Sequence, residues 1–160
     1  MRINTGAPKE SRLASPIAAV GTAANVTETT LQSFTLPANS LAVDGQAIRV
    51  VASGTMVGST RSRSIKLYLG ATVIATLTTA VATVTHWAME ATIVRTAAGA
   101  QRILVYVSAG SGAADTVSFT NNGVAAVSLT ADALVKVTGQ STTGAVANDL
   151  ACNMMLTHAI

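Results

Sequence analysis

Short segments in which apolar and polar residues alternate, separated by turn residues, make up most of this chain. Ser64–Leu69 is the clearest example, because every second side chain from Ile65 is aliphatic and would lie on one face of an extended strand. Gly70 and Ala71 then supply a tight turn, and Thr72–Leu77 returns. We therefore predict a hairpin over residues 64–77. No segment shows a convincing helical period.

The same pattern recurs along the chain, with Gly54 expected at a bulge or bend, Pro37 ending a strand, and Asn121-Asn122-Gly123 forming a hairpin turn. Strands at such short intervals are typical of an all-β sandwich or barrel. At this length the natural two-sheet arrangement is a jelly roll. The further predicted strands are Ile17–Thr22, Thr29–Leu36, Ala47–Val57, Val84–Thr96, Gln101–Ser108, Asp115–Thr120, Val124–Leu129, Ala133–Gly139 and Asp149–His158.

The chain of 160 residues predicts one domain preceded by an extended arm. Residues 1–16 contain Gly6, Pro8 and Pro16 together with most of the N-terminal charge, so we expect an arm that a partner orders. The β-sandwich domain is then predicted over residues 17–160. This N-terminal segment has no continuous apolar run, so no secretory signal is expected.

Composition changes the picture because charged residues are only 11% of the chain while hydrophobic residues are 49%. This balance excludes intrinsic disorder and disfavours a coiled coil. Small soluble domains usually keep a charged exterior. A weakly charged surface is easier to understand when other subunits cover it, so the composition favours a component of an assembly.

A membrane protein is disfavoured, although the stretch Leu67–Met89 carries no formal charge and is long enough to cross a bilayer. This stretch is rich in threonine and contains Gly70, a pattern typical of strand-turn-strand rather than of a lipid-facing helix. Aromatic residues are 3% of the chain, too few for the two girdles of an outer-membrane barrel. We therefore expect no membrane partner.

Nucleic-acid binding is also disfavoured, although the net charge is +3. The positive residues cluster only in Arg61–Lys66, where no aromatic side chain is available for stacking on bases. We interpret this segment as a solvated loop leading into a strand. Cys152 is the single cysteine, so no internal disulfide can form, and we expect it to be a small buried hydrophobe.

No recognisable catalytic pattern occurs in the sequence. Gly54–Thr60 lacks the lysine of a phosphate-binding loop, and no Gly-x-Ser-x-Gly elbow is present. The two histidines, His86 and His158, have no triad context; we interpret the first as a strand-edge residue and the second as a solvated tail residue. Trp87 is expected in the core rather than as a platform for a sugar ring.

The acidic residues never cluster, and neither they nor the histidines show the spacing of metal ligands. Asp44, Asp115 and Asp149 are best explained as turn or strand-end residues. Two carboxylates for glycoside hydrolysis could still meet in space. We predict no catalytic, cofactor-binding or metal-binding residues, no cofactor and no enzymatic activity.

Five segments of the sequence carry a resemblance to known proteins: Phe34–Leu41, Asp44–Val50, Ile65–Gly70, Trp87–Thr96 and Val137–Gln140. Together they resemble a group of small all-β structural proteins of tailed bacteriophages, and the similarity spans residues 28–158. This group includes head-decoration or cement proteins and the sandwich modules of tail appendages. Such sandwiches commonly form trimers, so the resemblance implies a homotrimer.

The sequence therefore favours a virion structural protein that is made in the host cytoplasm and decorates the capsid surface. As cement, it would bridge subunits of the major capsid protein, with residues 1–16 reaching a neighbour. Three alternatives remain open: a tail-fibre or receptor-binding module that binds glycans, a small capsid protein, and an enzyme such as a depolymerase with an unrecognised site.

Overall fold

The computed structural model describes residues 11–111, 115–119, 123–142 and 144–160, and within them every regular element is a β-strand. The prediction of an all-β fold is confirmed. No helix that is long and apolar enough to cross a membrane occurs in these ranges. The strands are β1 (Ser11–Ala14), β2 (Val20–Gly21), β3 (Thr29–Leu36), β4 (Ala47–Met56), β5 (Arg63–Leu69), β6 (Thr72–Thr79), β7 (His86–Ala97), β8 (Ala100–Gly110), β9 (Asp115–Phe119), β10 (Gly123–Ala125), β11 (Ala133–Ser141) and β12 (Leu150–Ala159).

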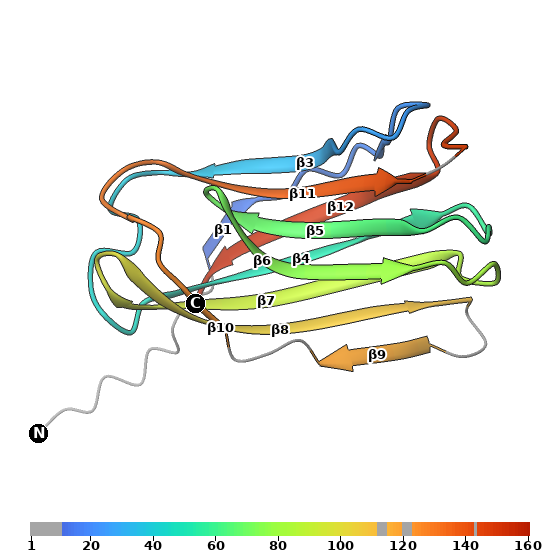
Figure 1. The fold of residues 1–160 in the computed structure, drawn as a ribbon. Coiled ribbons are helices and arrows are strands. Elements are labelled where there is room, and N and C mark those ends of the chain that lie inside the picture. Colours follow the sequence, from blue (N-terminus) through green and yellow to red (C-terminus); the bar gives the residue numbers. More distant parts are fainter. Residues whose placement is uncertain (1–10, 112–114, 120–122, 143) are drawn as a thin grey trace, which may run out of the picture.

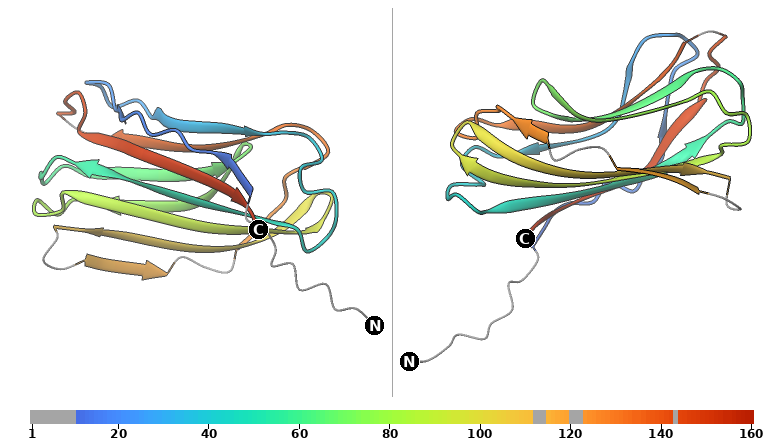
Figure 2. Two further views of the ribbon diagram at one scale, coloured as in Figure 1. Left: turned by 180° about the vertical axis from the view of Figure 1, so that it is seen from behind. Right: turned by 60° about the horizontal axis from the view of Figure 1, so that its bottom comes forward.

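Two antiparallel sheets form a sandwich (Figures 1 and 2). Sheet A has eight strands, in the order β1-β12-β4-β7-β8-β10, with β2 paired to β12 and β9 paired to β8. Sheet B has four strands, in the order β3-β11-β5-β6. The four-strand set β1-β12-β4-β7 opposite sheet B is the strand order of a jelly roll, and β8, β9 and β10 extend sheet A beyond it.

The core lies between the two sheets because alternate side chains of each strand point inward. In β5, for example, Ile65, Leu67 and Leu69 are buried, while Lys66 and Tyr68 on the other face are half-buried. Trp87 is 1% exposed, which confirms its predicted place in the core. Other fully buried large side chains are Leu31, Leu36, Ile48, Met89, Ile93, Leu150 and Met155.

A buried group of charges holds together one end of the sandwich. Arg63 is 1% exposed, and its guanidinium donates hydrogen bonds to the carbonyl oxygens of Val57, Ser59 and Val81, the last two at 2.9 Å. These carbonyls belong to the β4–β5 and β6–β7 connections. The interpretation of residues 61–66 as a solvated loop is wrong at Arg63, because protein carbonyls replace water around its charge.

The anion near Arg63 is Asp149, which directly precedes β12 and is fully buried. Its carboxylate accepts hydrogen bonds from Ser141 Oγ at 2.7 Å and Arg61 Nη1 at 3.0 Å. Burial lowers the pKa of Arg63; the charge of Asp149 opposes that shift and the charge of Arg61 adds to it. Three connections, β4–β5, β6–β7 and β11–β12, are thus tied to one another at this end.

Gly54 allows three strands of sheet A to approach closely around Trp87. Its register partners are Trp87 in β7 and Cys152 in β12, and the indole nitrogen donates a hydrogen bond to the carbonyl of Ala151 at 3.1 Å. A Cβ on Gly54 would collide with that carbonyl and lie 2.8 Å from Trp87 Cζ2. The irregularity predicted at Gly54 is a register shift in its pairing with β12, between Cys152 and Met154.

The N-terminal strand prediction is wrong in its position. Within the predicted strand Ile17–Thr22 only Val20–Gly21 is a strand. Ser11–Ala14, part of the predicted arm, pairs with β12 as β1, and residues 1–10 of the arm lie outside the described residues. Pro16, which has no N–H to donate, separates β1 from β2 along the edge of β12.

The predicted hairpin around Gly123 is also wrong. Its other turn residues, 121 and 122, lie outside the described residues, but β9 and β10 both pair antiparallel with β8 instead of with each other. The predicted strand Val124–Leu129 ends at Ala125. Beyond Ala125, the Gln101 side chain donates a hydrogen bond to the carbonyl of Val127 at 2.8 Å and accepts one from the Val127 N–H at 3.1 Å. The backbone of Val127 is therefore bonded to a side-chain amide rather than to the backbone of β8.

We predict that Gly54→Ala destabilises the fold by about 1–3 kcal/mol, because the added methyl group has no space beside a backbone carbonyl and an indole ring. Gly99→Ala is the matched control: nothing lies within 4 Å of the position of its Cβ, so its effect should stay within about 0.5 kcal/mol. Urea unfolding of both variants measures the difference, and equal effects would contradict the close-approach argument.

We also predict that Asp149→Ala lowers the free energy of unfolding by about 3 kcal/mol, because Arg61 and Arg63 then lose their nearby anion inside the protein. Asp44→Ala is the comparison, since Asp44 pairs with Arg95 at 3.0 Å but its side chain is 61% exposed. That variant should lose less than about 1 kcal/mol. Thermal unfolding followed by calorimetry would reveal whether the two losses differ.

Candidate functional site

The residues that sequence reasoning weighed for chemistry do not come together. In the part of the chain that the structure describes, no group of three histidine, cysteine, aspartate or glutamate side chains is placed to hold a metal ion. Cys152 is buried, as predicted, and burial raises the pKa of its thiol to about 11. The thiol therefore stays protonated near neutral pH and is a poor nucleophile.

The two histidines lie in strands of sheet A. His86 is half-buried and is the first residue of β7, a strand with neighbours on both sides. His158 is also half-buried and lies in β12, where it pairs across strands with Arg12 and Arg49, so its interpretation as a solvated tail residue is wrong. The ladder with β1 and β4 orders this part of the chain.

The described carboxylates are dispersed over the sandwich. Asp44 lies in the β3–β4 connection, whereas Asp149 lies in the β11–β12 connection directly before β12. Glu28 contacts residues on the outer side of sheet B, and Glu90 lies on the outer side of sheet A. The side chain of Asp115 lies outside the described residues. Asp44 and Asp149 thus occupy connections, as the sequence predicted for them.

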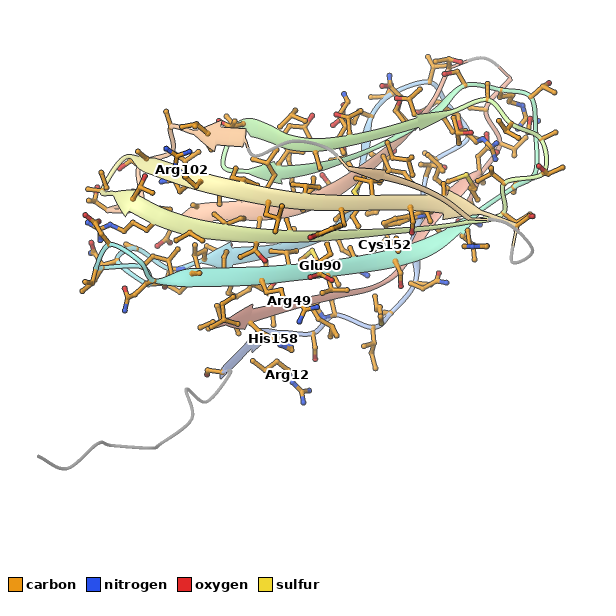
Figure 3. The ribbon with its side chains drawn as sticks, turned by 90° about the horizontal axis from the view of Figure 1, so that it is seen from below. Arg12, Arg49, Glu90, Arg102, Cys152 and His158 are labelled. Atoms are coloured by element: carbon orange, nitrogen blue, oxygen red, sulfur yellow. The ribbon has the colours of Figure 1, made fainter. Side chains whose placement is uncertain are left out.

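The outer side of sheet A, called face A below, combines apolar side chains with arginines (Figure 3). Directly paired residues of neighbouring strands share a face, so the register defines its rows. One row runs Arg12, His158, Arg49, Thr92, Leu104 across five strands; the next runs Leu156, Val51, Glu90, Tyr106; a third runs Met154, Ser53, Ala88, Ser108.

The charge on face A is only partly compensated. Arg49 Nε lies 2.9 Å from Glu90 Oε1, and both side chains are partly exposed, at 42% and 35%. Arg12 on β1 and Arg102 on β8 are exposed and have no ion pair within the described ranges. Four strand spacings separate these two, or roughly 19 Å. Among the side chains that the structure describes, face A therefore carries three arginines and one carboxylate, with unpaired cations at two flanks.

The outer side of sheet B, called face B below, differs from face A in composition. Its hydroxyl and amine groups suit contact with water, and Lys136 Nζ lies 4.6 Å from the ring centre of Tyr68. Exposed or half-buried polar side chains on this face are Ser33, Thr35, Ser64, Lys66, Thr76, Thr78, Lys136 and Gln140.

A hydrogen-bonded cluster crosses face B. The carboxylate of Glu28 accepts from Lys66 and Tyr68, each at 2.6 Å, and from Thr138 at 2.7 Å. Burial alone would raise the pKa of Glu28, but these hydrogen bonds and the charge of Lys66 lower it to about 2. The cluster joins the segment before β3 to β5 and β11, which indicates a structural role.

A groove between β6 and β8 opens at the side of the sandwich, with a volume of about 440 Å³. Threonine hydroxyls and aliphatic side chains line it, and its described lining has no charged or aromatic side chain. Such a groove could offer hydroxyl groups to a ligand but no stacking platform. The polar lining includes Thr76, Thr78, Thr79, Thr83 and Ser111.

Comparison with known proteins gives little further information. No family model matches the chain, and no curated protein matches it. Among solved structures, the chain is similar to the CBM2 module of an evolved Dit from Lactobacillus casei BL23 phage J-1, with a TM-score of 0.42 and 9% identity over 94% of this chain and 96% of that chain. A similarity of this size carries no argument about this chain.

Face A is the feature that sequence reasoning missed. The alternation in 84–96 already separates Glu90 and its outward neighbours from the buried face that contains Trp87. What the alternation does not contain is strand order, and only the order β1-β12-β4 brings Arg12, His158 and Arg49 into one row. Strand order is a non-local property, so the sequence pattern gave no signal for this row.

We predict that Glu28→Gln destabilises the fold near neutral pH and that this difference shrinks in acid. The folded-state pKa of Glu28 is below its ordinary value of 4.5, so its contribution is present above pH 4.5 and is lost as the pH falls toward about 2. Melting temperatures of both proteins from pH 7 down to pH 2 test this. Ser33→Ala, on the same face, should have a pH-independent effect; a pH-independent effect of Glu28→Gln would contradict the argument.

Proposed function

We propose that this chain is a non-enzymatic structural module of a bacteriophage virion that docks on the particle through face A. The difference between the two outer faces carries this proposal. Tyrosine, methionine and arginine are enriched in protein interfaces, and lysine and serine are depleted. Each face contains one described tyrosine, Tyr106 or Tyr68, and both contain serines, but face A adds Met154 and three arginines, whereas face B has two lysines and more threonine.

Fold and sequence support the same conclusion. Jelly rolls occur in viral capsid and lectin domains, although a fold alone does not define a function. The resemblance of residues 28–158 to small all-β virion proteins of tailed phages agrees with this architecture. A chain with 11% charged residues is also easier to keep soluble when one face is covered by a partner.

Within a virion, we favour a tail-appendage module over capsid cement. The cement hypothesis used residues 1–16 to reach a neighbouring capsid subunit, but Ser11–Ala14 pair with β12 in sheet A and are not available for bridging. A tail-fibre or receptor-binding module needs instead one docked face and one surface turned outward. Face B and the threonine-lined groove could serve as that outward surface.

The remaining parts of the proposal concern assembly and activity. We propose a homotrimer on the particle, as the resemblance implies, and recognition by surfaces rather than by catalysis. The dispersal of Asp44, Asp149, Glu28 and Glu90 over connections and opposite faces supports a non-enzymatic role, because paired carboxylates must lie close together to hydrolyse a glycoside.

Imaging of purified particles tests the proposal. Antibody fragments raised against the recombinant chain and coupled to gold should bind at the tail, and fragments against the major capsid protein serve as the control for the head. Label spread over the head shell would instead support the cement function and contradict a tail location. A chain that is absent from particles would contradict the virion assignment altogether.

A further inference from the structure

We propose that face A binds an acidic protein surface of the particle, with Arg12 and Arg102 as two flanking cations around an apolar centre. This inference rests on the proposed function, because it names the chemistry of the surface on which the module docks. Three observations carry it: the apolar centre, the unpaired arginines and the ion pair between them.

The centre of face A exposes large apolar side chains. Leu104 is 36% exposed and Tyr106 is 37% exposed, and they are two residues apart on the outer side of β8. Half-buried Val51 and Leu156 lie in the row of Tyr106, on the far side of Glu90. Contiguous apolar patches with a polar rim mark interaction sites on folded proteins. A shallow hollow of about 240 Å³ among Val51, Ala88, Glu90, Tyr106 and Ser108 could receive one side chain of a partner.

The charges around this centre indicate that the partner surface is negatively charged. Arg12 and Arg102 are exposed at opposite flanks and have no ion pair in the described part of the chain. A guanidinium binds carboxylates through two parallel hydrogen bonds, so acidic residues at matching positions would complement both flanks. In the centre, Arg49 and Glu90 already pair at 2.9 Å, so covering them leaves neither charge without a partner.

The same features favour a protein partner over two others, a nucleic acid and the face A of a second copy of this chain. Nucleic-acid binding needs a dense basic surface and stacking platforms. Face A instead has three arginines offset by Glu90, and Tyr106 is its single described aromatic side chain. Two copies of face A placed against each other would bring uncompensated arginines together, and like charges across an interface oppose association.

Rebinding to particles tests this proposal. Particles from a phage with the gene for this chain deleted are mixed with purified chain and sedimented. Arg102→Glu should weaken binding about tenfold or more, because a flank then repels the acidic partner. Arg12→Glu tests the other flank in the same way. Lys136→Glu is the matched control, since it makes the same change in charge on face B, and it should bind within about twofold of the wild type.

The outcomes separate this inference from the proposed function. Wild-type chain that fails to bind particles overturns the proposed function and the inference with it. If the wild type binds and Arg102→Glu and Arg12→Glu bind equally well, or no worse than Lys136→Glu, the module docks but not through acidic contacts on face A. Release of the wild type by added duplex DNA would show that the anion is a nucleic acid and would overturn the acidic-protein partner. Melting curves check that each variant is folded.

Discussion

One end of this sandwich depends on Arg63, a cation that has almost no contact with water. A buried guanidinium is costly unless it is paired and hydrogen-bonded. The two Nη atoms of Arg63 donate to carbonyl oxygens from two connections and Asp149 lies nearby, while its Nε has no hydrogen-bond partner among the described residues. The carbonyl oxygens of Val57 and Ser59 are close to Arg63 in the sequence. Val81 and Asp149 are more distant, so the full set of partners forms only when the β6–β7 and β11–β12 connections lie at this end of the sandwich. The interaction therefore ties local burial to the topology of the whole domain.

That topology produces two unlike surfaces. Because a jelly roll distributes consecutive strands between two sheets, the outward side chains of a short segment are divided between opposite sides of the molecule. β4 and β7 place their outward residues on face A, whereas β5 and β11 place theirs on face B. Threonine and lysine accumulate on one side and arginine on the other. A module with this asymmetry can have one side covered and one side exposed.

Alternation in the sequence was enough to predict the all-β class and most strands within a few residues. The alternation did not predict strand ends, strand pairing or burial where these depend on a side chain or on a distant strand. The Gln101 amide ends the strand at Ala125, and β8 is long enough to pair with both β9 and β10. The burial of Arg63 and the row through His158 were unpredictable for the same reason, because both depend on contacts between distant segments.

The pairing of β1 with β12 has a mechanical consequence. Ser11 lies opposite Ala159, so the described ends of the chain emerge side by side at one edge of sheet A (Figure 1). A force that pulls these two ends apart would load the hydrogen bonds of this ladder one after another, as in opening a zipper, rather than all at once in shear. The domain would therefore resist a load spread over the face of a sheet far better than a load applied at these two ends.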